Sequence, residues 1–149
     1  MAAYAAARGV VLAMEPHVDG PADTPERMLE ILRLVDAPAL RVNFYISHFD
    51  ILGMSTKDSV AALVPCSVHT HLKDQRGRYP DYRFLTPGEG GFDYARHLLA
   101  MQEAGNDGSI NAEVSMLRQR NPDYDPVAAC GQCCRTSAAA LEAAGIARR

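Results

Sequence analysis

The chain has 149 residues, of which 48% are hydrophobic, and its formal net charge is −3. This length indicates one domain over residues 1–149, with enough apolar residues for a sizeable core. The basic residues are scattered, which argues against nucleic-acid binding. No apolar run reaches the roughly 18 residues of a membrane span, so we expect no membrane partner. Four cysteines in a chain of this length favour a reducing, cytoplasmic setting over a disulfide scaffold.

Short apolar segments alternate with helical patterns along the chain. The four predicted strands are Gly9–Pro16, Leu40–Phe49, Cys66–Asp74 and Gly108–Ser115. An amphipathic helix follows the first strand, with Thr24 as its predicted N-cap and Pro25 at its first position. Four rounds of strand and helix predict an α/β fold with a parallel sheet that helices cover.

Three further helical patterns complete this alternation. They lie at residues 54–65, Phe92–Gly105 and Asp125–Gly145. Ser55 or Thr56 is the predicted N-cap of the first of them. The segment Gln75–Gly91 carries no predicted element and is too long for an ordinary connection between a strand and a helix. Loops of this length in compact domains are often functional.

Polar residues gather on one face of each predicted strand, near its end. Side chains alternate across a strand, so His69, His71 and Lys73 share one face of the third strand. Parallel strands end at the same edge of the sheet, which we call the rim. The residues expected to meet there are Glu15, Tyr45 or Asn43, His71 and Glu113. Two carboxylates and an imidazole make a site for a divalent metal, and a cation there offsets the cost of burying carboxylates.

The alternative for each of these residues is that it merely begins a loop. The same switch in polarity in four strands favours the metal site over that alternative. Among the other histidines, His69 is predicted to be an internal, hydrogen-bonded residue rather than a ligand. His17 is interpreted as a loop residue and His97 as a residue of a helix surface.

The segments LAMEPH, VNFYISHF, HTHLKD, PGEGGFDY and INAEVS together resemble the second half of the xylose isomerase-like TIM barrels. This family comprises sugar isomerases, ketose 3-epimerases and inosose dehydratases, and it is related in fold to endonuclease IV. The resemblance covers about residues 9–144. It implies a parallel (β/α)4 half of an eight-stranded barrel with its active site at the C-terminal rim.

The resemblance implies a divalent metal held by Glu, Asp, His and Glu, and Glu15, His71 and Glu113 match three of these positions. In the family's Asp-x-x-His pattern His48 matches the histidine, but Tyr45 stands at the Asp position. A neutral phenol is a poor ligand for Mg²⁺ or Mn²⁺. The identity of the metal stays open among Mn²⁺, Mg²⁺, Co²⁺ and Zn²⁺.

The resemblance further implies a metal-dependent isomerase or epimerase that acts on a small sugar or polyol. Glu15 and Glu113 would move protons at sugar carbons while the metal polarises neighbouring oxygens. The residues expected to hold substrate hydroxyls are His48, Lys73 and either Arg76 or Arg78. Glu89, in the PGEGG segment, is interpreted as a residue that shapes the loop.

A complete barrel of this kind takes about 250 residues, whereas the chain supplies four βα units. A half-barrel has two open strand edges, which invite pairing with another chain. We therefore expect a homo-oligomer, most simply a two-fold dimer, or a partner that supplies a complementing half-barrel. The alternative is that the chain is a fragment of a barrel whose N-terminal half is missing. One rival hypothesis is a non-catalytic, truncated half-barrel that self-associates. Another is a nuclease like endonuclease IV, which the acidic charge balance disfavours.

Three of the four cysteines lie close together in the sequence. Cys130, Cys133 and Cys134 are spaced to share one face of a helix, and Cys66 begins the third predicted strand. We interpret them as core residues, because buried cysteines often behave as small hydrophobes. A metal-binding or redox-sensitive cluster is the alternative, although the paired knuckles of a zinc site are missing from the sequence.

Overall fold

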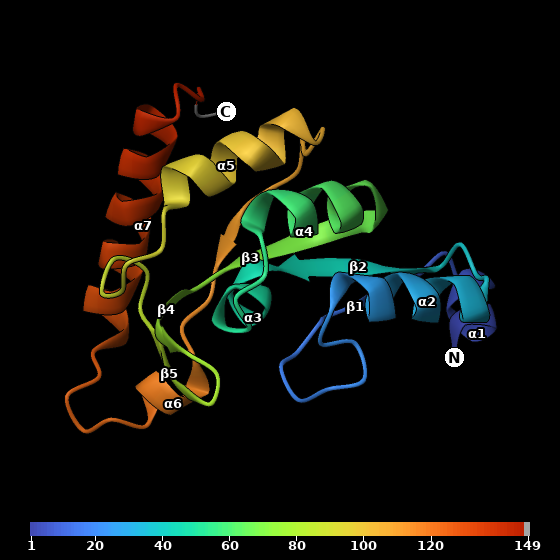
Figure 1. Ribbon diagram of the computed structural model, residues 1–149, viewed down its shortest axis with the longest axis horizontal. Helices are drawn as coiled ribbons and strands as arrows, with labels where there is room; N and C mark the ends of the chain where they lie inside the picture. Colours follow the sequence, from blue (N-terminus) through green and yellow to red (C-terminus); the bar gives the residue numbers. More distant parts are fainter. Residues whose placement is uncertain (148–149) are drawn as a thin grey trace.

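The computed structural model describes residues 1–147 and contains a parallel sheet whose strands are joined by helices (Figure 1). The strands of this sheet are β1 (Leu12–Met14), β2 (Leu40–Tyr45), β3 (Ser67–Leu72) and β6 (Asn111–Ala112). They lie in the order β1-β2-β3-β6, and each neighbouring pair is parallel. The predicted α/β fold with a four-stranded parallel sheet is therefore confirmed, and β1 and β6 form its two edges.

Seven α-helices connect and flank the strands in the described part of the chain. They are α1 (Ala2–Ala6), α2 (Pro25–Val35), α3 (Ile46–Ile51), α4 (Thr56–Leu63), α5 (Tyr94–Glu103), α6 (Met116–Gln119) and α7 (Pro126–Ala143). The side chains of Thr24, Ser55 and Asp125 accept backbone N–H groups at the starts of α2, α4 and α7. These caps confirm the starts expected from the sequence. No helix within residues 1–147 has the length and apolar character needed to cross a membrane.

One face of the sheet packs against the helices and forms the main core. Val42 and Phe44, which alternate along β2, are completely buried on this face. The cluster around them contains Ala22, Met28, Ile46, Phe49, Val60, Leu63, Val64 and Met101. Full burial of each large side chain contributes about 1.5–3 kcal/mol. On the opposite face of the sheet Ala13 and His69 are exposed, whereas Asn43 and Tyr45 of the central strand β2 are buried.

All four strands are shorter than the sequence predicts, since β1 spans Leu12–Met14 where the prediction had Gly9–Pro16 and β3 spans Ser67–Leu72 where it had Cys66–Asp74. β2 ends at Tyr45 rather than Phe49, because α3 begins at once and places Ile46 and Phe49 together in the core. These two residues are three positions apart, which is a helical spacing. β6 has two residues where the prediction had Gly108–Ser115, and as an edge strand it pairs with β3 alone.

The segment expected to be irregular, Gln75–Gly91, contains most of a β-hairpin. Its strands are β4 (Asp74–Arg78) and β5 (Asp81–Leu85), which pair antiparallel. Gly77 has a φ of 86°, and a Cβ at this position would lie 2.2 Å from the Asp81 carbonyl oxygen. Only glycine therefore fits. The Asp50 carboxylate accepts a hydrogen bond from Gln75 (2.7 Å) and pairs with Arg78 (2.9 Å), which fastens the hairpin to α3.

The buried carboxylate of Asp74 organises the loop that follows the hairpin. Its oxygens accept backbone N–H groups of Gln75 (2.9 Å), Gly88 (2.9 Å), Gly90 (2.9 Å) and Phe92 (3.4 Å). A Cβ on Gly90 would lie 2.0 Å from Asp74 Oδ1. The same loop holds α7, since the Pro87 carbonyl accepts hydrogen bonds from Gln132 and Thr136, both at 3.1 Å. Asp74, at the start of β4, thus orders the loop that in turn binds the last helix.

Two histidines lie in surroundings opposite to those predicted. His97 is buried in α5 against Phe44 and Phe92, with ring centroids 6.1 and 5.5 Å away. Burial lowers the pKa of His97 to about 4, and the prediction of a helix-surface position is wrong. His69, expected to be internal, is exposed because its face of the sheet is open. Its Nδ1 lies 3.5 Å from the Asn111 amide nitrogen.

The cysteines of α7 do not share one environment. Cys133 is buried, whereas Cys130 and Cys134 are exposed, and all four cysteines are free. Burial raises the pKa of the Cys133 thiol. Within residues 1–147 no cysteine belongs to a group with metal-binding geometry. The predicted core packing is therefore confirmed for Cys133 and wrong for Cys130 and Cys134, while Cys66 packs beside the main core.

Replacing Asp74 by alanine should lower the free energy of unfolding by about 3 kcal/mol, because it leaves one buried and three partly buried N–H groups without their acceptor. Urea denaturation of the wild-type and variant chains measures this loss. Asp123→Ala is the matched control, since Asp123 is exposed and pairs with Arg118 at the surface; its effect should stay below about 1 kcal/mol. Equal stability of the two variants would contradict the role given to Asp74.

Candidate metal centre

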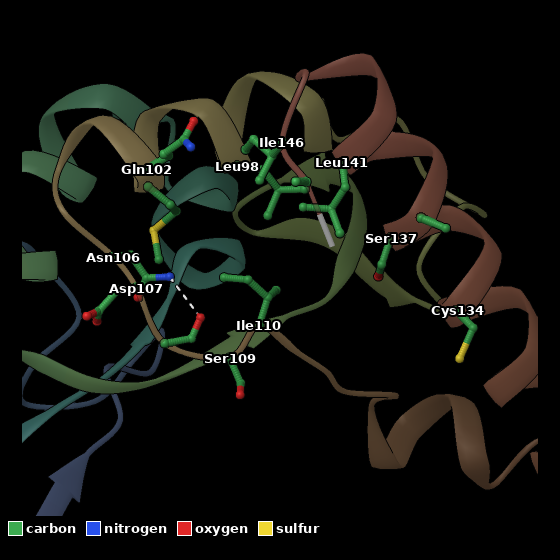
Figure 2. A pocket seen from close by; sticks show the side chains of 14 residues that line it. Leu98, Gln102, Asn106, Asp107, Ser109, Ile110, Cys134, Ser137, Leu141 and Ile146 are labelled. Atoms are coloured by element: carbon green, nitrogen blue, oxygen red, sulfur yellow. Dashed lines mark hydrogen bonds between the residues drawn. The ribbon is translucent and has the colours of Figure 1, made fainter. Parts of the chain in front are cut away.

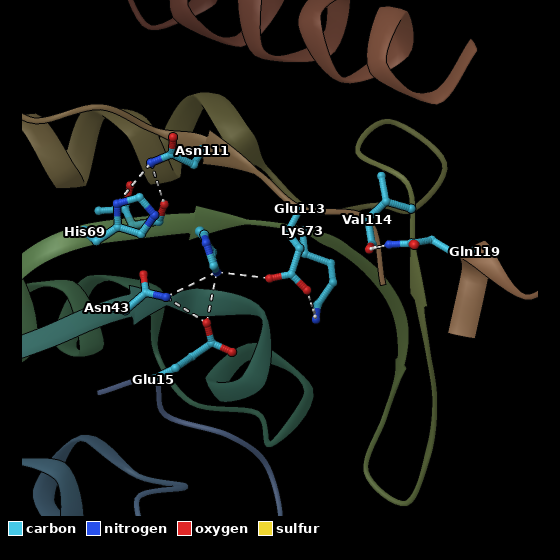
Figure 3. A network of polar contacts seen from close by, with 10 residues as sticks. Glu15, Asn43, His69, Lys73, Asn111, Glu113, Val114 and Gln119 are labelled. Carbon is cyan, nitrogen blue, oxygen red and sulfur yellow. Dashed lines mark hydrogen bonds and ion pairs between the residues drawn. The ribbon is translucent and has the colours of Figure 1, made fainter. Parts of the chain in front are cut away.

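The ends of three strands bring two carboxylates to one imidazole. Glu15 directly follows β1, His71 lies in β3, and Glu113 directly follows β6. Glu15 Oε2 lies 2.9 Å from His71 Nδ1, and Glu113 Oε2 lies 3.0 Å from the same nitrogen. Figure 3 shows both glutamates directed toward this point. The strand pattern predicted this convergence, and the three side chains form the group with metal-binding geometry found in residues 1–147.

The contacts around His71 Nδ1 exceed what one nitrogen can satisfy. The Asn43 amide nitrogen also lies 3.2 Å from it, beside the two carboxylate oxygens. A ring nitrogen carries at most one proton, so it can direct a hydrogen bond at only one of these oxygens. The donor set of two carboxylates and an imidazole matches a divalent cation, which would attract all three ligands at once. The residues present therefore fit a metal ion.

Asn43, rather than Tyr45, makes the polar contact that β2 contributes to this centre. Its amide nitrogen donates a hydrogen bond to Glu15 Oε2 at 2.7 Å. The ring of Tyr45 is fully buried and meets the edge of His71, with centroids 5.1 Å apart. Burial, and then the nearby charge of Glu113, raise the pKa of Tyr45, so the phenol stays neutral. Tyr45 therefore cannot replace the charge of an aspartate.

Lys73 lies beside the centre in an almost fully buried position. Its ammonium group is 3.6 Å from Glu113 Oε1 and lies over the rings of Phe84 (4.0 Å) and Tyr45 (4.3 Å). Burial lowers the pKa of Lys73, whereas Glu113 and Glu15 act in the opposite direction. Burial is also the main cause that raises the pKa of Glu15. Lys73 thus supplies a positive charge between the carboxylates and the hairpin.

His48 lies beneath the surface next to Lys73. Its ring contacts those of His17 (4.2 Å), Tyr45 (4.8 Å) and Phe84 (5.0 Å). The Val18 N–H donates to His48 Nδ1 at 3.2 Å, so the proton of the neutral ring belongs on Nε2. Burial lowers the pKa of His48 to about 3. Nε2 has no hydrogen-bond partner and is an unused donor near the rim.

The two candidate arginines lie on the hairpin and contact its surroundings. Arg76 donates to the Glu89 carbonyl oxygen at 2.8 Å, and Arg78 pairs with Asp50. The partners of both arginines therefore lie in the hairpin, its loop and α3, and not among the carboxylates of Glu15 and Glu113. Glu89 accepts the Thr86 N–H at 3.0 Å, as a residue that shapes the loop would. Two groups near the site were not expected from the sequence, the carboxylate of Asp74 and the ring of Phe84. Both act through the β4–β5 hairpin, which was not predicted.

A separate hollow of about 660 Å³ lies between α5, α7 and the start of β6 (Figure 2). Its apolar lining includes Leu98, Ile110, Leu141 and Ile146. None of the three candidate ligands lines it. This hollow adjoins the open β6 edge of the sheet and is distinct from the metal centre.

The fold and the rim together define half of a parallel α/β barrel with carboxylates and an imidazole at the ends of its strands. A family model described as the xylose isomerase-like TIM barrel matches residues 1–130. The chain belongs to this family. The predicted family membership and the half-barrel fold are therefore confirmed.

Individual relatives agree with this assignment. An uncharacterized protein from Methanocaldococcus jannaschii is 31% identical over 97 residues, which is 64% of this chain and 32% of that protein. The structure of an L-ribulose 3-epimerase matches with a TM-score of 0.78 at 17% identity, over 97% of this chain and 51% of the other. A xylose isomerase-like protein from Mycobacterium smegmatis in complex with magnesium matches with a TM-score of 0.67 at 20% identity, over 96% and 46%. The chain thus spans a third to a half of these relatives.

Proposed function

We propose that the chain forms the metal-binding half of an isomerase or epimerase that acts on a small sugar or polyol. The observation that carries this proposal is the placement of Glu15 and Glu113 on either side of His71 Nδ1, at 2.9 and 3.0 Å. Membership of the xylose isomerase-like family, which is rich in sugar enzymes, supports the choice of substrate class. Its structural relatives include an L-ribulose 3-epimerase.

Glu15, His71 and Glu113 would hold the divalent ion. The magnesium complex of a relative shows that this fold accommodates such an ion elsewhere in the family. Asn43 is the candidate for a fourth metal ligand, because Tyr45 stands at the position where an aspartate was expected. Its amide nitrogen already lies 2.7 Å from Glu15, and the buried Oδ1 has no hydrogen-bond partner. Turning the amide by 180° would present an oxygen to the centre in place of the nitrogen.

The chemistry proposed for the two glutamates is proton transfer at a carbon next to a carbonyl group. Glu15 comes from one edge of the sheet and Glu113 from the other. One carboxylate can therefore remove a proton from a substrate carbon, while the other delivers a proton from a different side. A bound divalent cation supplies polarisation of the neighbouring substrate oxygens. Lys73 and the Nε2–H of His48 are candidate donors to substrate hydroxyls, and Arg76 is a more distant candidate on the hairpin.

Divalent metal should stabilise the folded chain. Thermal unfolding is measured after metal removal and again with Mn²⁺, Mg²⁺, Co²⁺ or Zn²⁺. A ligand at about 100 times its dissociation constant adds about 2.7 kcal/mol to stability. Glu113→Ala should abolish this gain, whereas Glu103→Ala, at an exposed position at the end of α5, should retain it. A gain of equal size in both variants would place the ion elsewhere.

Proton transfer can be followed without knowing the product. We expect the metal-loaded chain to exchange carbon-bound hydrogen for deuterium in one member of a panel of ketoses and aldoses in D2O. Glu15→Gln should slow this exchange by about 10²- to 10⁴-fold, because it removes a general base. Glu26→Gln on the exposed side of α2 is the matched control. Metal binding without exchange in any sugar would instead favour the non-catalytic half-barrel.

We also propose that a second copy of the chain completes the barrel. Both edges of the four-stranded sheet, β1 and β6, are open, and a two-fold arrangement would pair each with the opposite edge of the partner. The relatives of known structure are about twice as long as this chain. Exposed Val10 and Val11 flank the β1 edge, and the apolar hollow flanks the β6 edge.

Light scattering should therefore give the mass of two 16.2 kDa chains. Val11→Lys should shift the mass toward one chain, because it places a charge at the open edge. Val127→Lys, at an exposed position in the first turn of α7, should leave the dimer intact. A monomer at all concentrations would contradict self-association and require a different partner for the open edges.

A further inference from the structure

A row of aromatic rings lines one face of the β4–β5 hairpin. The ring centroids of Tyr79 and Tyr82 lie 6.3 Å apart, and those of Tyr82 and Phe84 lie 5.2 Å apart. Tyr79 is 48% exposed, and the other two are half-buried. Gly77 is the cross-strand partner of Tyr82, so no side chain covers the tyrosine from that position. The row is therefore open to solvent at its outer end.

The loop between β1 and α2 places an imidazole and a carboxylate near this row. His17 is exposed, and its ring lies 4.2 Å from that of His48, which in turn contacts Phe84 at 5.0 Å. The exposed Asp19 lies beside the Tyr79 hydroxyl and raises the pKa of that phenol. His17 is therefore linked to Phe84 through the buried ring of His48, and Asp19 lies next to Tyr79 at the outer end of the row.

The inner end of the row reaches the metal centre through direct contacts. Phe84 lies under the Lys73 ammonium group at 4.0 Å, and Lys73 pairs with Glu113 at 3.6 Å. A molecule that extends outward from Glu113 would pass Lys73 and Phe84 before it met Tyr82 and Tyr79. The mechanism proposed above gives no role to either tyrosine.

We propose that Tyr79 and Tyr82, with Asp19 and His17 nearby, form an outer subsite for a pyranose ring attached to the reacting sugar. The C–H groups of a pyranose carry partial positive charge and suit the negative face of an aromatic ring. The carboxylate and imidazole suit hydroxyl groups at the edge of the same sugar, as in sites that combine apolar walls with few polar groups. The substrate class is thereby narrowed to disaccharides and other glycosides.

The choice of a sugar as ligand rests on the proposed function, whereas the location of the subsite rests on the ring contacts alone. Binding to this subsite does not require the metal ion, since none of its four residues is a candidate ligand. Binding in the presence of EDTA therefore tests the subsite separately from the metal centre. Thermal unfolding of the wild-type chain with metal tests the proposed function independently.

The experiment is isothermal titration of the whole chain with cellobiose, lactose and maltose in EDTA. We expect at least one of these disaccharides to bind. Tyr82→Ala and Tyr79→Ala should each weaken that binding by up to about tenfold, which corresponds to the loss of one aromatic contact. Tyr82→Phe should retain it, because the ring face is kept. Tyr4→Ala is the matched control, since Tyr4 is an exposed tyrosine on α1.

Each result bears on the proposal. Weaker binding by each of the two alanine variants, with unchanged binding by Tyr82→Phe and Tyr4→Ala, supports the subsite even if metal fails to stabilise the chain. Near-ultraviolet circular dichroism confirms that the variants keep their fold. Absence of binding by all three disaccharides, or equal weakening in Tyr4→Ala, overturns the proposal. In that case stabilisation by metal would leave the proposed function standing with a monosaccharide as substrate.

Discussion

Two carboxylates share one imidazole nitrogen at the rim of this sheet, and the electrostatics of that contact shape the surrounding structure. Glu15 and Glu113 would repel each other as bare anions, and partial burial weakens their hydration. The structure surrounds them with groups that offset these costs. Asn43 donates to Glu15, and the buried Lys73 pairs with Glu113. Because a single nitrogen cannot satisfy both carboxylates, the arrangement favours a cation as a further partner.

The hairpin and its loop keep this charged centre next to an aromatic surface. Asp74 fixes the loop after β5 through backbone N–H groups, and Asp50 ties the hairpin to α3. Phe84 is thereby held beneath the Lys73 ammonium group and against His48. The rim consequently joins two kinds of surface, a compact set of charges suited to a metal ion and a row of rings suited to an apolar face of a ligand.

Much of the fold was predictable because parallel strands follow simple rules of alternation. The period of two in the third strand placed His71 on the polar face and Leu72 in the core, and the order of strands brought Glu15 and Glu113 toward it. The hairpin was not predicted, since its strands carry charged residues on one face and are interrupted by Gly77. His97 was misplaced because one buried polar residue in an otherwise apolar helix face does not change the helical pattern.

Crystals grown with Mn²⁺ and measured for anomalous scattering test the metal centre most directly. We expect one strong anomalous peak within about 2.0–2.6 Å of Glu15 Oε2, His71 Nδ1 and Glu113 Oε2. The Asn43 amide, rather than the Tyr45 hydroxyl, should be the β2 group nearest to that peak. A peak elsewhere in the chain, or no peak at a saturating concentration of Mn²⁺, would contradict the central claim that these three strand ends form a metal site.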